Sequence, residues 1–128
     1  MSTINIIKYI CKEYGYIELS FMRLTKLLYF IDLYYKQTNN KQLTDVDWNN
    51  VNYEQFIIDK ISITNGFKVI NSRTIYKTAK TVVEYDGDAP EIINGKEVVD
   101  TIITTTKNLT WFELIVLCSY WETEKPLV

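Results

Sequence analysis

The side chains that most often carry out catalysis are scarce in this sequence. Its 128 residues include no histidine and only two cysteines, Cys11 and Cys118, which lie far apart in apolar segments. The absence of histidine removes the usual general base, the Ser-His and Cys-His nucleophile pairs and the commonest transition-metal ligand. We therefore expect no enzyme, no cofactor and no metal site, and we expect both cysteines to be reduced thiols in the core.

Lysine and carboxylate chemistry remains open in principle at two places. Lys26 lies in a strongly apolar helical segment, where a base of lowered pKa is one interpretation. The simpler interpretation is that its methylene stem packs while its ammonium reaches water or pairs with a carboxylate such as Asp32.

Residues 45–56 begin like a calcium-binding loop, but Asn50 replaces the glycine and Phe56 the glutamate that such a loop needs. We interpret the start of this segment as a turn before a helix.

The composition fits one globular domain. The chain is 47% hydrophobic, and at 128 residues a domain removes roughly two thirds of its unfolded surface from water. The first residues lack the features of a secretory signal, and no apolar stretch is long enough to span a bilayer. We expect a single domain over residues 1–128, a cytoplasmic location and no membrane association.

The net charge of −2 gives no general attraction to nucleic acid. The charges are unevenly distributed, however, because every charged residue between Asp59 and Glu84 is basic. We interpret this segment as a solvated hairpin with one basic end. The weaker alternative is a nucleic-acid binder that uses a basic arm, whose phosphate-facing residues are Lys68, Arg73, Lys77 and Lys80.

Apolar residues at helical spacing predict that much of the chain is helical. A first helix is expected over residues 3–14, and a second over residues 20–38, where the first residue is a serine suited to N-capping. The second helix is apolar on nearly all sides, so it must be buried between other elements. A third helix is predicted to open at Asn52, with Gln55 as its capping-box partner, and to close at residues 65–66.

The hydrophobic period changes after the third predicted helix. β-branched and aromatic residues alternate in part over residues 67–70, 74–78 and 81–85, which predicts a small antiparallel β-arm. The predicted fold class is therefore α+β and predominantly helical, a single compact domain with a central buried helix and this arm.

Two segments complete the chain. Residues 95–107 favour a strand by propensity, but their apolar residues also form a helical stripe. Thr110 and Glu113 have the spacing of a capping box, which predicts a last helix rich in apolar residues.

Three blocks of the sequence resemble one known family. They are Leu-Thr-Lys-Leu-Leu-Tyr-Phe at residues 24–30, Thr-Asp-Val-Asp-Trp at residues 44–48 with Tyr53, and Tyr-Trp-Glu-Thr-Glu-Lys-Pro at residues 120–126. Their content and order are similar to those of the Panacea family, the SocA-like antitoxin domain. The resemblance implies a helix over residues 95–107. It also implies an antitoxin that neutralises a partner protein by direct binding, in some members by presenting the toxin to a protease.

One departure from the family pattern opens an alternative. Family members usually follow the aromatic residue at the position of Tyr53 with Gly-Pro, and this chain has Glu54-Gln55 there. The exchange alters the surface that would meet the family's usual partner. The alternative function is an inhibitor of a host defence or nuclease complex, built on the same domain by a phage or mobile element in the manner of an anti-CRISPR protein.

The sequence has more amphipathic aromatic residues than a core of this size requires, with ten tyrosines and three tryptophans. Tyrosine and tryptophan are enriched in interface hot spots because they combine large area with a polar group. We expect a protein partner, a toxin or a defence-system subunit, and leave the oligomeric state open. The predicted partner-binding residues are Trp48, Tyr53, Glu54, Gln55, Tyr120, Trp121, Glu122 and Glu124.

Overall fold

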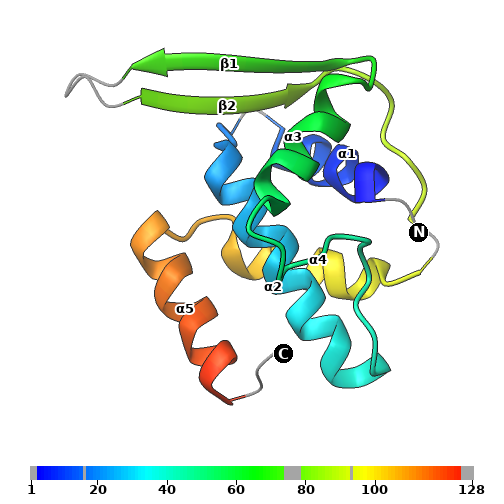
Figure 1. Cartoon of the computed structure of the whole chain (residues 1–128), viewed down its shortest axis with the longest axis vertical. Coiled ribbons are helices and arrows are strands. Elements are labelled where there is room, and N and C mark those ends of the chain that lie inside the picture. The colour runs from blue at the N-terminus through cyan, green and yellow to red at the C-terminus, as the bar shows by residue number, and fades with distance from the viewer. Residues whose placement is uncertain (1–2, 16, 74–78, 93, 125–128) are drawn as a thin grey trace.

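The part of the chain that the structure describes folds into five helices and one β-hairpin (Figure 1). In this computed structural model the described residues are 3–15, 17–73, 79–92 and 94–124, and the side chains of residues 72, 73, 79, 80, 123 and 124 lie outside the description. The predominantly helical α+β prediction is confirmed. In chain order the elements are α1 (Thr3–Tyr14), α2 (Phe21–Asn39), α3 (Tyr53–Ser62), β1 (Phe67–Arg73), β2 (Ala79–Tyr85), α4 (Lys96–Thr106) and α5 (Trp111–Glu124).

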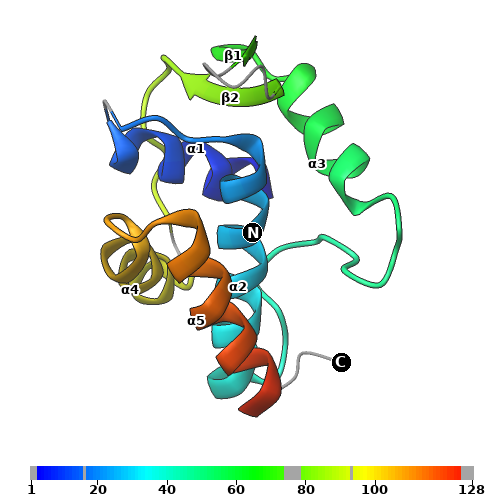
Figure 2. The ribbon, with the colours of Figure 1, turned by 90° about the vertical axis from the view of Figure 1, so that its left-hand side faces the viewer.

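α2 is the central element, as its apolar residues predict. Leu24, Leu27, Leu28 and Ile31 are fully buried, and the helix packs against α1, α4, α5 and β2. Figure 2 shows α2 running through the middle of the molecule, with the hairpin across one end. Full burial of a leucine or isoleucine side chain is worth about 1.5–3 kcal/mol. The second helix therefore supplies a large share of the hydrophobic stabilisation.

Local signals predict several helix ends correctly. The Ser20 hydroxyl accepts a hydrogen bond from the Arg23 N–H at 3.1 Å, as an N-cap does. Thr110 and Glu113 form a reciprocal capping box, in which each backbone N–H donates to the other's side chain at 2.9 and 3.1 Å. α4 is a helix, which confirms the choice of helix over strand for this segment.

The third helix begins where it is predicted to, with Asn52 at the N-cap position, but the predicted capping box and the predicted end at residues 65–66 are wrong. Asn52 makes no side-chain capping bond, because its backbone (φ −100°, ψ 20°) is not in the extended conformation that directs an N-cap side chain at the first turn. Gln55 instead donates its side-chain amide to Asp59 at 2.7 Å. The helix ends at Ser62, and Gly66, with φ of +95°, belongs to the turn into β1. A side chain at Gly66 would meet the Tyr85 ring, which excludes larger residues.

The β-arm is an antiparallel hairpin with one inner and one outer strand. Its register runs from Phe67 opposite Tyr85 to Arg73 opposite Ala79. β2 is the inner strand, because the Val83 N–H donates to the Leu19 carbonyl at 2.9 Å and Val83 is buried. The prediction of a β-arm is confirmed for these two strands, and the predicted strand over residues 74–78 lies outside the described residues.

Arg23 holds the end of α4 and the following turn against α2. Its Nη2 donates to the carbonyls of Thr106 and Leu109 at 2.5 and 2.8 Å, and its Nε donates to the Tyr14 hydroxyl at 3.0 Å. The last carbonyls of a helix have no partner within the helix, so a cation at this position satisfies them. One guanidinium thus connects α1, α2 and the link that leads into α5.

Asp32 is a fully buried carboxylate at the centre of a second set of contacts. It accepts hydrogen bonds from the backbone N–H groups of Leu43 and Thr44 at 3.0 and 2.8 Å, from the Thr44 hydroxyl, and from Trp48 Nε1 at 2.7 Å. A buried charge is tolerated only with such partners. The hypothesis that Asp32 pairs with Lys26 is therefore wrong, because the loop after α2 supplies its donors.

We expect Asp32→Asn to destabilise the fold by about 1–3 kcal/mol, because the new amide would turn a donor toward the indole N–H of Trp48 and leave it without an acceptor. Chemical denaturation gives the free energy of unfolding. The exposed Asp88 offers a control, and Asp88→Asn should change that energy by less than about 0.5 kcal/mol. Equal effects of the two substitutions would contradict the anchoring role of Asp32.

The pH dependence of the unfolding free energy of wild type and Asp32→Asn provides a second prediction. Burial raises the pKa of Asp32, while the hydrogen bonds from Thr44, Trp48 and Leu43 oppose the rise. A raised pKa in the folded state means that the folded protein binds the proton first, so this contribution to stability grows as pH falls. The difference in unfolding free energy between wild type and Asp32→Asn should widen from pH 7 toward pH 4. A narrowing difference would mean that the hydrogen bonds outweigh burial.

We expect Arg23→Lys to destabilise the protein by about 1–2 kcal/mol, because an ammonium cannot reproduce the three directed bonds of the guanidinium. Unfolding of the exposed Lys41→Met variant serves as the control for loss of a surface cation. Hydrogen exchange should also quicken at the last turn of α4 in Arg23→Lys. Unchanged protection there would refute the role assigned to Arg23.

Candidate protein-binding site

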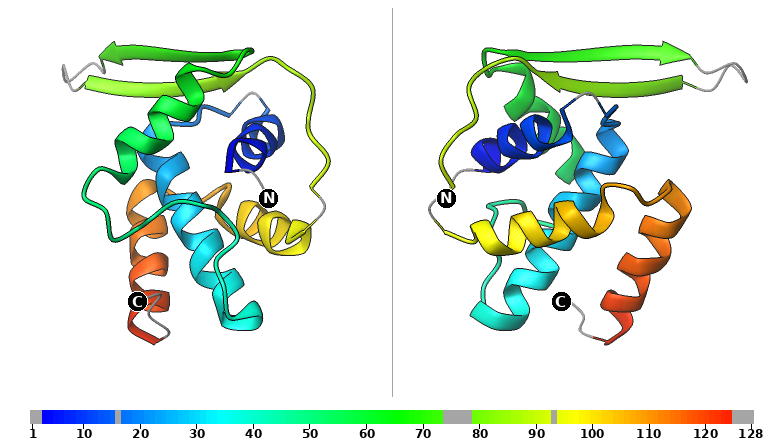
Figure 3. Two further views of the ribbon diagram at one scale, coloured as in Figure 1. Left: turned by 45° about the vertical axis from the view of Figure 1, so that its right-hand side comes forward. Right: turned by 180° about the vertical axis from the view of Figure 1, so that it is seen from behind.

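A cavity of about 310 Å³ lies between α2, the start of α3 and α5. Figure 3, left, shows the start of α3 and the loop before it beside α2 and α5. Two of the three tryptophans of the chain line the cavity. The lining residues are Met22, Thr25, Lys26, Tyr29, Trp48, Tyr53, Glu54, Trp111, Ile115 and Glu122.

Three aromatic rings, of which the central one contacts the other two, form one wall of the cavity. The Trp48 ring lies edge-on to Tyr29 and to Tyr53, with ring centroids 5.2 Å apart in both pairs. Such aromatic pairs are worth about 0.5–1.5 kcal/mol beyond the area that they bury. The bond from Trp48 Nε1 to Asp32 fixes the orientation of the central ring. The wall is therefore held in place before any ligand arrives.

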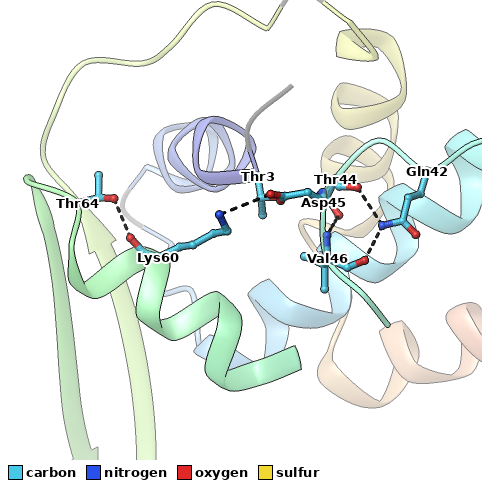
Figure 4. Close-up of polar contacts among 7 residues, drawn as sticks. All are labelled: Thr3, Gln42, Thr44, Asp45, Val46, Lys60 and Thr64. Carbon is cyan, nitrogen blue, oxygen red and sulfur yellow. Dashed lines mark hydrogen bonds and ion pairs between the residues drawn. The ribbon is translucent and has the colours of Figure 1, made fainter. Parts of the chain in front are cut away.

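The loop that carries Trp48 is also anchored away from Asp32. Figure 4 shows Asp45 between the first turn of α1 and α3. The Thr3 hydroxyl bonds to the Asp45 carboxylate and accepts from its N–H at 3.1 Å, and Lys60 Nζ lies 3.6 Å from that carboxylate. Gln42 spans the turn by donating to two backbone carbonyls of the loop, at 2.9 and 2.6 Å. These contacts connect α1, the loop and α3.

The cavity carries two carboxylates and one ammonium. Lys26 Nζ lies 5.6 Å from the centroid of the Tyr29 ring, and no carboxylate of the described residues lies within 4 Å of it. Glu54 is exposed and Glu122 is half-buried. Within the described part of the chain, the Glu54 carboxylate makes no hydrogen bond or ion pair, and the Glu122 carboxylate accepts one weak bond from the Cys118 thiol at 3.6 Å. The cavity thus has an excess negative charge with unused acceptors.

The other reactive groups near the cavity are held in their neutral forms. Burial raises the pKa of the Cys118 thiol to about 12, with a smaller contribution from Glu122. Burial also raises the pKa of Tyr29 to about 12, and Glu122 adds to the effect. A protonated thiol is a poor nucleophile. The arrangement is suited to binding rather than to covalent chemistry.

The structure brings together half of the predicted partner-binding residues. Trp48, Tyr53, Glu54 and Glu122 line the cavity. Gln55 is exposed beside them on α3, where it bonds to Asp59.

The remaining predicted residues lie elsewhere on α5. Trp121 packs against Phe30 and Tyr34 of α2, with ring centroids 6.3 and 5.5 Å apart, so it is largely a packing residue. Tyr120 is 61% exposed. The side chain of Glu124 lies outside the described residues.

Sequence reasoning missed the contribution of the first half of α5. Trp111 and Ile115 line the cavity, while Phe112, Val116 and Tyr120 form an exposed apolar row at a spacing of four residues. Phe112 is 74% exposed. The sequence did contain a signal, namely the apolar residues on all sides of the last helix. A helix of this kind exposes part of its apolar surface when it lies at the edge of a fold.

A second cavity of about 430 Å³ extends the first toward the hairpin. It shares Met22 and Trp111 with the first cavity and is also lined by Phe21 and by Thr81 of β2. The two cavities and the apolar row of α5 form one extended surface, which we call the α2–α5 surface.

The predicted basic arm receives little support. Lys68 is exposed on β1, and the register of the hairpin places it directly opposite the acidic residue Glu84. The side chains of Arg73 and Lys80 and the whole of Lys77 lie outside the described residues. A basic face is therefore not assembled by the described part of the arm.

The described residues contain neither a metal-binding cluster nor a membrane-spanning helix. Among the described residues, no group of three or more histidine, cysteine, aspartate or glutamate side chains is placed to hold a metal ion. Within the same residues, no helix is both long enough and apolar enough to cross a bilayer.

Comparison with known proteins identifies the family. The family model described as "Antitoxin SocA-like, Panacea domain" matches residues 24–122, which include every residue that lines the first cavity except Met22. No curated protein and no solved structure gives a significant match. Because the match extends over most of the chain and contains most of α2, the anchored loop and most of α5, this protein belongs to the SocA-like antitoxin family that is defined by the Panacea domain.

Proposed function

We propose that this chain is a non-catalytic antitoxin that neutralises a toxin protein by binding it directly through the α2–α5 surface. The observation that carries the proposal is the joining of a fixed aromatic cavity to an exposed apolar row on α5. Interface hot spots are aromatic, desolvated and surrounded by polar groups. Trp48, Tyr53 and Trp111 supply the aromatic anchors, and Glu54 and Glu122 supply polar groups at the edge.

The mechanism that fits this surface is occlusion. A partner segment that covers the cavity and the apolar row is held away from its own target, and no chemical step is needed. The neutral state of Cys118 and Tyr29 agrees with this mechanism. Presentation of the bound toxin to a protease is compatible with the same contacts, because it needs only a stable complex.

A second candidate function rests on Glu54. Where the family usually has Gly-Pro, this chain places Glu54 and Gln55, and Glu54 lines the cavity. The proposal is that the pair adapts the surface to a different partner, such as a subunit of a host defence or nuclease complex. Cytoplasmic action fits both candidates.

The first test is capture of the partner with the tagged protein from extract of its native cell, followed by mass spectrometry and co-expression. An antitoxin should retain a protein that arrests growth when expressed alone, and growth should return when both proteins are expressed. Retention of a defence or nuclease subunit would favour the second candidate. Retention of nucleic acid that is lost at higher salt would support the basic arm instead.

The apolar row provides a matched pair of variants. Phe112→Ser should raise the dissociation constant of the captured partner about tenfold or more, because a large exposed apolar contact is lost. Ile63 is 85% exposed and lies at the far end of α3 from the cavity, so Ile63→Ser should leave the constant within about twofold. Calorimetric titration measures both values. Equal binding by the two variants would remove α5 from the interface.

Replacing Glu54 and Gln55 by the Gly-Pro pair that family members usually carry tests whether these two residues adapt the surface to a particular partner. The double variant Glu54→Gly and Gln55→Pro should remain folded, because a proline is tolerated in the first turn of a helix, where N–H groups have no partner within the helix. We expect its affinity for the native partner to fall about tenfold if Glu54 contacts that partner. An unchanged affinity, with circular dichroism showing an intact fold, would rule out the adaptation at Glu54.

A further inference from the structure

We propose that the first cavity receives an arginine side chain of the partner, an inference that rests on the proposed function. The cavity is small, at about 310 Å³, which is the lower limit of ordinary ligand sites and suits one long side chain. The identity of that side chain follows from the chemistry of the walls and the rim.

The aromatic wall is suited to a cation. Tryptophan and tyrosine faces attract an ammonium or guanidinium within about 6 Å of the ring centroid. The cavity already contains one such contact, since Lys26 Nζ lies 5.6 Å from the centroid of Tyr29. Trp48 and Tyr53 continue the wall beyond Tyr29. Their indole and phenol rings are the groups on which a second cation can stack.

The charges of the cavity favour a cation over an anion. Glu54 and Glu122 outnumber Lys26, and neither carboxylate is ion-paired within the described residues. The only bond that Glu122 accepts there comes from a thiol at 3.6 Å. A partner carboxylate would pair with Lys26 but would also face both glutamates, whereas a partner cation gains two acceptors and meets one like charge.

Arginine fits these features better than lysine does. A guanidinium is planar, stacks on aromatic rings and sheds water more readily than an ammonium. It also donates up to five hydrogen bonds and can bond to two carboxylates at once. The adjoining apolar residues Met22 and Ile115 can cover its methylene stem. Arginine is accordingly enriched at the centres of protein interfaces.

The test uses the peptide acetyl-Leu-Arg-Leu-amide and two relatives in which citrulline or glutamate replaces the arginine. Citrulline has nearly the shape of arginine without its charge. Chemical shifts of the indole N–H groups report binding, because Trp48 and Trp111 line the cavity and Trp121 packs elsewhere. We expect the arginine peptide to shift the first two signals saturably, to leave Trp121 unmoved, and to bind at least tenfold more tightly than either relative.

Two variants that are expected to change the affinity for the arginine peptide in opposite directions make the test more specific. Glu122→Gln should weaken the arginine peptide about fivefold or more, and Lys26→Gln should tighten it, because it removes the like charge. Glu84 is exposed on the hairpin, and Glu84→Gln should have no effect. Equal binding of the citrulline peptide, preference for the glutamate peptide, or no saturable shift would each overturn the proposal. These measurements need no partner protein, so their failure is distinct from failure of the Phe112 test.

Discussion

The buried carboxylate of Asp32 is the interaction on which the rest of the site depends. A negative charge in the core of the central helix is stable only if donors surround it, and here the donors come from the loop that follows the same helix. The loop must therefore pass close to α2. This one requirement fixes the backbone at Leu43 and Thr44 and the indole of Trp48, and it turns a polar loop of 13 residues between Asn39 and Tyr53 into a supporting wall.

The cavity depends on three segments that are distant in sequence. α2 provides its floor, the loop and α3 provide the aromatic wall, and α5 closes the opposite side. Asp32 positions the second of these segments, and Arg23 positions the third by binding the carbonyls that precede α5. Both residues belong to α2. The central helix thus organises the α2–α5 surface through two polar side chains, while its apolar side chains stabilise the fold.

The sequence predicts those features that depend on the pattern and spacing of residues close to one another in the chain. The burial of the central helix follows from apolar residues on all its sides, and the Thr110–Glu113 capping box follows from a spacing of three residues. The absence of a capping box at the start of the third helix could not be predicted in the same way, because the backbone angles of Asn52 depend on the folded loop. The donors to Asp32 lie 11 to 16 residues away in sequence, and Met22 and Trp111 meet only after α5 has folded back. The aromatic residues near the loop and Glu122 near the end of α5 were therefore predicted, whereas the contribution of the first half of α5 was not.

Trp48 serves the fold and the surface at once, and this has an evolutionary consequence. A change at Trp48 removes one of the four donors to a buried carboxylate, so selection on stability restrains that position whichever partner is present. Glu54, Phe112 and Val116 project from helices into solvent and can vary at little cost to folding. A protein built on this domain can therefore vary the exposed residues of the α2–α5 surface while the buried contacts between Trp48 and Asp32, and with them the stability of the fold, stay unchanged.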